Sequence, residues 1–122
     1  MRKILVVEDE EMLRESYKMI LSTEPYDLYI ASNGKEALEM CKDNKFDLIL
    51  LDLMMPLING VDFLEKFGRG GNLPSKVIIL STLSSGAELN RALELGAYRN
   101  VLKSDLSPRQ LISTVRLELE AV

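Results

Sequence analysis

The stretch Leu48-Ile49-Leu50-Leu51-Asp52 consists of four apolar residues in a row that end on a carboxylate. Three other apolar runs also end on polar residues: 4–7 before Glu8 and Asp9, 77–80 before Ser81, and 101–102 before Lys103. Short runs of this kind between helical patterns are typical of buried strands in a parallel sheet. The carboxyl ends of such strands share one edge of the sheet, where ligands bind. We therefore expect these polar side chains to gather in one acidic pocket.

Size and composition indicate one ordinary globular domain over residues 1–122, with 47% hydrophobic and 28% charged residues. The net charge of −4 and the lack of any basic run disfavour direct binding of nucleic acid. No segment is apolar enough to span a bilayer, and the N-terminus does not look like a signal peptide. A single cysteine, Cys41, fits a reducing cytoplasm, and the absence of histidine excludes Ser-His-Asp catalysis and His-metal sites.

Hydrophobic periodicity predicts strands and helices in strict alternation. The strands are expected at about 3–7, 26–31, 46–51, 76–80 and 98–102, and the helices at about 10–22, 34–43, 61–67, 85–95 and 108–120. This pattern predicts the α/β class, namely a doubly wound (βα)5 flavodoxin-like three-layer sandwich. Its five-stranded parallel sheet has the order 2-1-3-4-5, so Asp9 and Asp52 would flank the crevice between strands one and three.

Local signals add detail to this outline. Asn33, Asn59 and Ser107 are expected to cap the starts of three helices, and Gly96 to end the fourth. Met12 is expected in the apolar stripe of the first helix, and the pair Met54-Met55 to serve packing rather than chemistry.

Three carboxylates in one pocket, from Glu8, Asp9 and Asp52, would repel one another unless a cation lay among them. Because no His or Cys is nearby, the ligands are hard oxygens, and Mg²⁺ is the natural guest. Lys103 adds a mobile positive charge and Ser81 a hydroxyl donor, and phosphoryl transfer onto an aspartate needs such groups. Taken singly, a strand-end cap, a surface lysine and a turn serine would explain Asp52, Lys103 and Ser81 equally well.

Over essentially its whole length the chain resembles the receiver domain of bacterial response regulators, and is similar to the chemotaxis regulator. The intervals of 43, 29 and 22 residues between Asp9, Asp52, Ser81 and Lys103 fit that family. The other motifs that carry the resemblance are Ile4-Leu5-Val6-Val7-Glu8-Asp9-Glu10, Asp52-Leu53-Met54-Met55-Pro56, Asn59-Gly60 and Leu95-Gly96-Ala97.

The resemblance implies that Asp52 accepts a phosphoryl group from a sensor histidine kinase or a phosphotransfer protein. It implies that Asp9, Asp52 and the backbone carbonyl of Met54 hold Mg²⁺, that Glu8 acts through a bound water, and that Ser81 and Lys103 bind phosphoryl oxygens. The domain would catalyse only its own phosphorylation and dephosphorylation, with no turnover of an external substrate. Signalling would pass through the fourth helix, fifth strand and fifth helix to an output domain or protein, and the same surface could form a homodimer.

Four residues depart from the family pattern. Glu8 replaces the commoner Asp, and Thr82 stands where a very small residue is preferred. Asn100 occupies the position of the aromatic switch residue, and Ser104 replaces the proline that usually follows the lysine. The phosphorylation chemistry is therefore expected to be intact, whereas its relay to the surface is expected to be unusual.

Two other functions are compatible with the same residues. A hydrolase that forms an aspartyl intermediate would carry a second acid two residues after the nucleophile, where this chain has Met54. A receiver-like protein-interaction module that works without phosphorylation is the other alternative.

Overall fold

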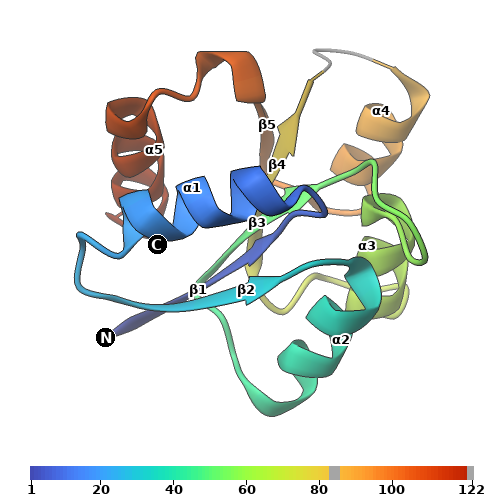
Figure 1. The fold of residues 1–122 in the computed structure, drawn as a ribbon. Coiled ribbons are helices and arrows are strands. Elements are labelled where there is room, and N and C mark those ends of the chain that lie inside the picture. Colours follow the sequence, from blue (N-terminus) through green and yellow to red (C-terminus); the bar gives the residue numbers. More distant parts are fainter. Residues whose placement is uncertain (83–85, 121–122) are drawn as a thin grey trace.

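Five parallel strands form the centre of the structure, a computed structural model that describes residues 1–82 and 86–120 (Figure 1). They are β1 (Arg2–Val7), β2 (Tyr26–Ala31), β3 (Leu48–Asp52), β4 (Lys76–Ser81) and β5 (Arg99–Leu102), in the order β2-β1-β3-β4-β5. The helices are α1 (Glu11–Leu21), α2 (Gly34–Asp43), α3 (Gly60–Gly68), α4 (Ala87–Glu94) and α5 (Pro108–Glu120), with a short 3₁₀ turn, η1 (Lys103–Asp105), after β5. The predicted doubly wound α/β fold and its strand order are confirmed.

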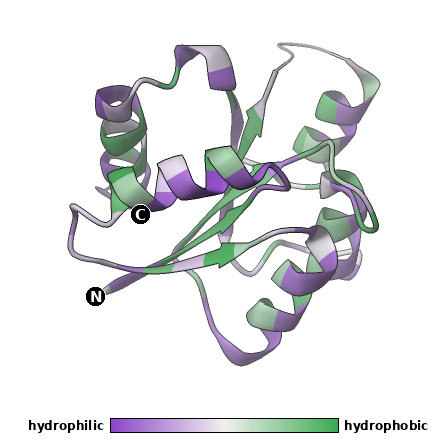
Figure 2. Cartoon of the chain, in the orientation of Figure 1, coloured by the Kyte–Doolittle hydropathy of each residue, from purple (hydrophilic) through white to green (hydrophobic). Residues whose placement is uncertain are grey.

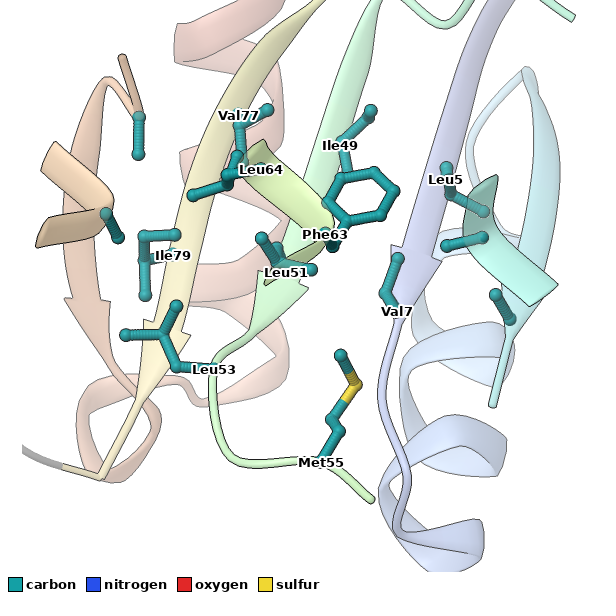
Figure 3. Packing of buried hydrophobic residues seen from close by; sticks show 14 of the residues in the cluster. Leu5, Val7, Ile49, Leu51, Leu53, Met55, Phe63, Leu64, Val77 and Ile79 are labelled. Atoms are coloured by element: carbon teal, nitrogen blue, oxygen red, sulfur yellow. The ribbon is translucent and has the colours of Figure 1, made fainter. Parts of the chain in front are cut away.

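Alternation along the strands divides the core into two layers. Leu5, Ile49 and Ile79 belong to the cluster that α2, α3 and α4 cover, part of which appears in Figure 3. Leu50 and Ile78 point to the opposite face, where they pack with residues of α1 and α5. Figure 2 shows that the central strands are largely hydrophobic, while the helices carry both polar and apolar residues.

β3 is the centre of this arrangement. All five of its residues are buried, and it pairs with β1 on one side and β4 on the other. A strand with helices on both faces needs a continuous apolar run rather than an alternating one, because neither face meets water. The sequence prediction that this strand is central is confirmed.

The helix caps lie where the sequence predicted them. The side-chain oxygens of Asn33 and Asn59 accept hydrogen bonds from backbone N–H groups in the first turns of α2 and α3, each at 2.9 Å. Ser107 Oγ accepts the Gln110 N–H at 3.1 Å, and Gly96 follows α4 with a φ of 115°. Such caps satisfy N–H groups that have no partner within the helix.

Several local predictions were wrong. Phe46 precedes β3 rather than opening it, and it packs edge-on against the Tyr29 ring with centroids 5.3 Å apart. Met12 is 86% exposed and Met54 is 64% exposed, so neither packs in the core as expected, whereas Met55 does. The start of the predicted fourth helix, at about residue 85, lies outside the described residues.

Candidate functional site

The polar residues singled out in the sequence lie at the carboxyl ends of four neighbouring strands. Glu8 and Asp9 directly follow β1, while Asp52 and Ser81 are the last residues of β3 and β4. Lys103 directly follows β5 as the first residue of η1. Parallel register places these ends side by side, because Asp52 pairs with Leu80 and Ser81 with Leu102.

Three carboxylates form an acidic cluster at this edge. Glu8, Asp9 and Asp52 each offer an oxygen, and these oxygens lie within 4.8 Å of one another. Glu8 is 1% exposed and Asp52 is 5% exposed, while Asp9 is half-buried. All three donors are hard oxygens, which suit Mg²⁺ far better than a softer metal. The cluster could therefore hold a divalent cation.

Lys103 forms ion pairs with two of these carboxylates. Its Nζ lies 2.7 Å from Glu8 Oε1 and 3.4 Å from Asp52 Oδ2, and its side chain is 15% exposed. Burial lowers the pKa of Lys103, but the hydrogen bond to Glu8 and the charge of Asp52 outweigh that effect and raise it. Lys103 is therefore a permanent positive charge in the site.

One lysine does not balance the negative charge around Asp52. Burial, followed by the charge of Glu8, raises the pKa of Asp52 from 3.8 to about 7, although Lys103 acts in the opposite direction. A carboxylate that is isolated from water and faces another negative charge favours its protonated form. In the absence of a further cation, Asp52 is therefore only partly ionised near neutral pH.

Backbone interactions fix the loops that carry these carboxylates. Arg14, in α1, donates from Nη1 to the carbonyl oxygens of Glu8 and Asp9 at 3.0 and 2.7 Å. Asp52 Oδ1 accepts the N–H of Met54 at 3.3 Å. The sequence did not predict this role of Arg14, because its position in the sequence pattern is the same as that of solvent-exposed basic residues on other helices.

Gly60 brings the loop after β3 against the strand end. A Cβ atom at this position would lie 2.7 Å from the carbonyl oxygen of Asp52 and from the Cα of Leu53. Its N–H donates to the carbonyl of Leu53 at 2.9 Å. The first turn of α3 can therefore lie directly against the backbone of the site only because residue 60 has no side chain.

Known proteins resemble this chain along most of its length. The model of the family described as "Response regulator receiver domain" matches residues 4–116. The chain belongs to this family. None of the helices in the described part of this receiver domain is long and apolar enough to cross a membrane.

The curated relatives of the receiver domain include the transcriptional regulatory protein SrrA of Staphylococcus aureus. It is 35% identical over 116 residues, which are 93% of this chain but 46% of that protein. The chain thus spans less than half the length of the curated relatives it matches.

Solved structures of receiver domains superpose closely. A CheY-like response regulator receiver domain protein from Methanospirillum hungatei JF-1 has a TM-score of 0.85 at 27% identity, covering 99% of this chain and 95% of that chain. The receiver domain of the Francisella response regulator 1452 has a TM-score of 0.84 at 30% identity, covering 99% and 98%.

The residues that depart from the family pattern occupy defined places in the structure. Asn100, which the resemblance places at the switch position, accepts a hydrogen bond from Ser81 Oγ at 2.7 Å. Thr82 is exposed, next to the end of β4. No peptide bond in the described segments is cis, so Ser104 follows Lys103 through a trans bond. Sequence reasoning identified the substitution at residue 100 but not its hydrogen bond to Ser81.

Proposed function

We propose that this receiver domain accepts a phosphoryl group on Asp52 and signals through the resulting change in conformation. The donor would be the phosphohistidine of a sensor kinase or of a phosphotransfer protein. The observation that carries this proposal is the position of Asp52, a buried carboxylate at a strand end with Asp9 beside it and Lys103 3.4 Å away. A nucleophile, a group of metal ligands and a fixed cation would thereby lie side by side.

In the proposed reaction an oxygen of Asp52 attacks phosphorus. The new O–P bond forms as the N–P bond of phosphohistidine breaks, and the imidazole nitrogen leaves with the electron pair and takes up a proton. Lys103 and the hydroxyl of Ser81 would bind phosphoryl oxygens, Lys103 by offsetting charge and Ser81 by donating a hydrogen bond. The reaction requires an ionised Asp52, so with a pKa of about 7 only part of the chains would be reactive near neutral pH without further positive charge in the site.

Asp9, Asp52 and the backbone carbonyl of Met54 would hold Mg²⁺ directly. Glu8 would act through a bound water, since its carboxylate oxygens already engage Lys103 and the N–H of Glu10. The bound ion would supply the positive charge that the carboxylates and the phosphoryl oxygens need. The fit rests on the donor set, because the three carboxylates supply only hard oxygens within 4.8 Å of one another.

The test is phosphorylation by acetyl phosphate with Mg²⁺, read by intact-protein mass. We expect one phosphoryl group on the wild-type chain and none on Asp52→Ala or Asp52→Asn. Asp43→Asn, which alters an exposed carboxylate at the end of α2, is the matched control and should be phosphorylated normally. A wild-type chain without an adduct, or an adduct that survives in the Asp52 variants, would contradict the proposal.

The output surface would be formed by α4, β5 and α5. Asn90, Arg91 and Glu94 on α4, Tyr98 before β5 and Gln110 on α5 are all exposed there, as is Asp105 in η1. This surface would meet an output domain or protein in the cytoplasm, and it could also form a homodimer. Sedimentation with and without beryllofluoride, which mimics the phosphoryl group on aspartate, would show whether phosphorylation changes the oligomeric state.

We expect no turnover of external phosphoesters, because the place of a second acid is taken by the exposed Met54. We also propose that residues 1–122 form a single receiver domain. If the chain binds its protein partner equally well with and without beryllofluoride, the alternative of a phosphorylation-independent interaction module is favoured instead.

A further inference from the structure

The hydroxyl of Ser81 is held by a residue of the neighbouring strand. Its Oγ donates to Asn100 Oδ1 at 2.7 Å, across 19 residues of sequence. Ser81 is 8% exposed, and Asn100 is half-buried. While the Ser81 hydroxyl donates its hydrogen to Asn100, it cannot donate that hydrogen to another acceptor.

The bond lies on the face of the sheet that α4 covers. Side chains of a strand alternate between faces, so Ser81 shares the face of Ile79. Asn100 is the register partner of Ile79 on β5. Ile79 in turn belongs to the same buried cluster as Leu89 and Ala92 of α4. Ser81 and Asn100 therefore lie on the face of the sheet whose buried cluster includes residues of α4, the helix that follows β4 in the sequence (Figure 1).

A serine hydroxyl has one hydrogen and can donate it to one acceptor at a time. An ionised phosphoryl group on Asp52 offers acceptors only, so Ser81 must donate if it is to bind a phosphoryl oxygen. The hydrogen bond to Asn100 and the hydrogen bond to the phosphoryl group thus exclude one another.

We propose that Asn100 is a positioning residue that holds the Ser81 hydroxyl in the unphosphorylated chain and loses it when Asp52 is phosphorylated. This inference rests on the proposed function of Asp52. On release, the donor passes from the side-chain oxygen of Asn100 to a phosphoryl oxygen. Asn100 thereby weakens binding of a phosphoryl group at Asp52, because the Ser81 hydroxyl must leave Asn100 before it can bind a phosphoryl oxygen.

Competition for one hydroxyl predicts a specific pattern of affinities. Beryllofluoride with Mg²⁺ is the probe, and its apparent Kd is measured for the wild type, Asn100→Leu, Ser81→Ala and the double variant. Leucine is close to asparagine in size but cannot accept the hydroxyl, so Asn100→Leu should bind beryllofluoride about two- to tenfold more tightly, as expected for losing one competing hydrogen bond. In the Ser81→Ala background the same substitution should leave the affinity unchanged.

A conservative variant and a direct readout keep the test independent of folding defects. Asn100→Asp retains an oxygen acceptor and should not show the gain in affinity. In the wild type, the side-chain amide resonances of Asn100 in ¹⁵N-correlated NMR spectra should shift when beryllofluoride and Mg²⁺ are added. Ser81→Ala should change the same resonances before any beryllofluoride is added.

Each result has one meaning. A wild-type chain that does not bind beryllofluoride refutes the proposed function itself. Binding by the wild type, combined with an Asn100→Leu effect that is the same with and without the Ser81→Ala substitution, overturns the role of Asn100 and leaves the function of Asp52 intact. A loss of affinity in Asn100→Leu, or side-chain amide resonances of Asn100 that do not respond to beryllofluoride, also overturns it.

Discussion

Replacing Asp52 by Asn should stabilise the chain in the absence of divalent cations. The wild-type carboxyl is 5% exposed and lies near the charge of Glu8, and its pKa is raised from 3.8 to about 7. Asparagine has the same shape and keeps an oxygen to accept the N–H of Met54, but it cannot ionise. The substitution therefore removes a buried charge at little cost in packing.

The size and sign of the effect follow from the shift in pKa. The unfolded chain releases the proton of Asp52 near pH 3.8 and the folded chain only near pH 7, so the wild type loses stability as the pH rises between these values. A shift of about three units corresponds to up to ~4 kcal/mol. Asp52→Asn should thus match the wild type at about pH 4 and exceed it by up to ~4 kcal/mol at about pH 8.

Urea unfolding in EDTA across this pH range measures the difference. Asp43→Asn, at the exposed end of α2, is the control and should stay within about 0.5 kcal/mol of the wild type at every pH. Adding Mg²⁺ should reduce the gap by stabilising the wild type. If the two proteins are equally stable at about pH 8 without Mg²⁺, or differ by the same amount at every pH, the charge balance inferred for the site is wrong.

Three further substitutions test other parts of the structure. Lys103→Met leaves the buried carboxylates of Glu8 and Asp52 without their cation, so we expect a loss of ~2–4 kcal/mol in urea unfolding at about pH 8 and a smaller loss at about pH 5. Burial raises the pKa of Glu118, but its partners Lys76 and Arg99 outweigh this effect and lower the pKa. Glu118→Gln should therefore lower the free energy of unfolding by ~1–3 kcal/mol at neutral pH. This difference should shrink as the pH falls below 4.5. Gly60→Ala brings a methyl group to 2.7 Å from the backbone of Asp52, so thermal unfolding should show a loss of ~1–3 kcal/mol, and a variant as stable as the wild type would contradict the close packing.

The sequence was sufficient to predict the sheet and the edge on which the site lies. The run before Asp52 is apolar at every position, and only a strand covered on both faces requires this. Once the strands alternate with helices, right-handed crossovers leave few orders for the sheet. The carboxyl ends of the strands, and with them the acidic cluster, then follow from topology rather than from any detail of packing.

Details that depend on how neighbouring elements meet could not be predicted in this way. Met12 fits the period of α1 but lies on its exposed side, because hydrophobicity alone does not define the edge of a helical stripe. The hydrogen bond between Ser81 and Asn100 depends on the register of β4 against β5, and the sequence does not state that register. Arg14 reaches two backbone carbonyls, which are features of the loop conformation and not of the residue pattern.

The length of the Glu8 side chain has a consequence for the whole site. The longer side chain places its carboxylate 2.7 Å from Lys103, closer than the 3.4 Å that separates the lysine from Asp52. Burial, followed by the charge of Glu8, raises the pKa of Asp52 to about 7, because the one lysine offsets only part of these effects. Because a protonated aspartate is a poor nucleophile, the resting chain should be weakly reactive until a divalent cation supplies the missing charge. We therefore expect phosphorylation to depend steeply on Mg²⁺ near neutral pH, and Glu8→Asp to weaken that dependence by leaving Lys103 nearer to Asp52.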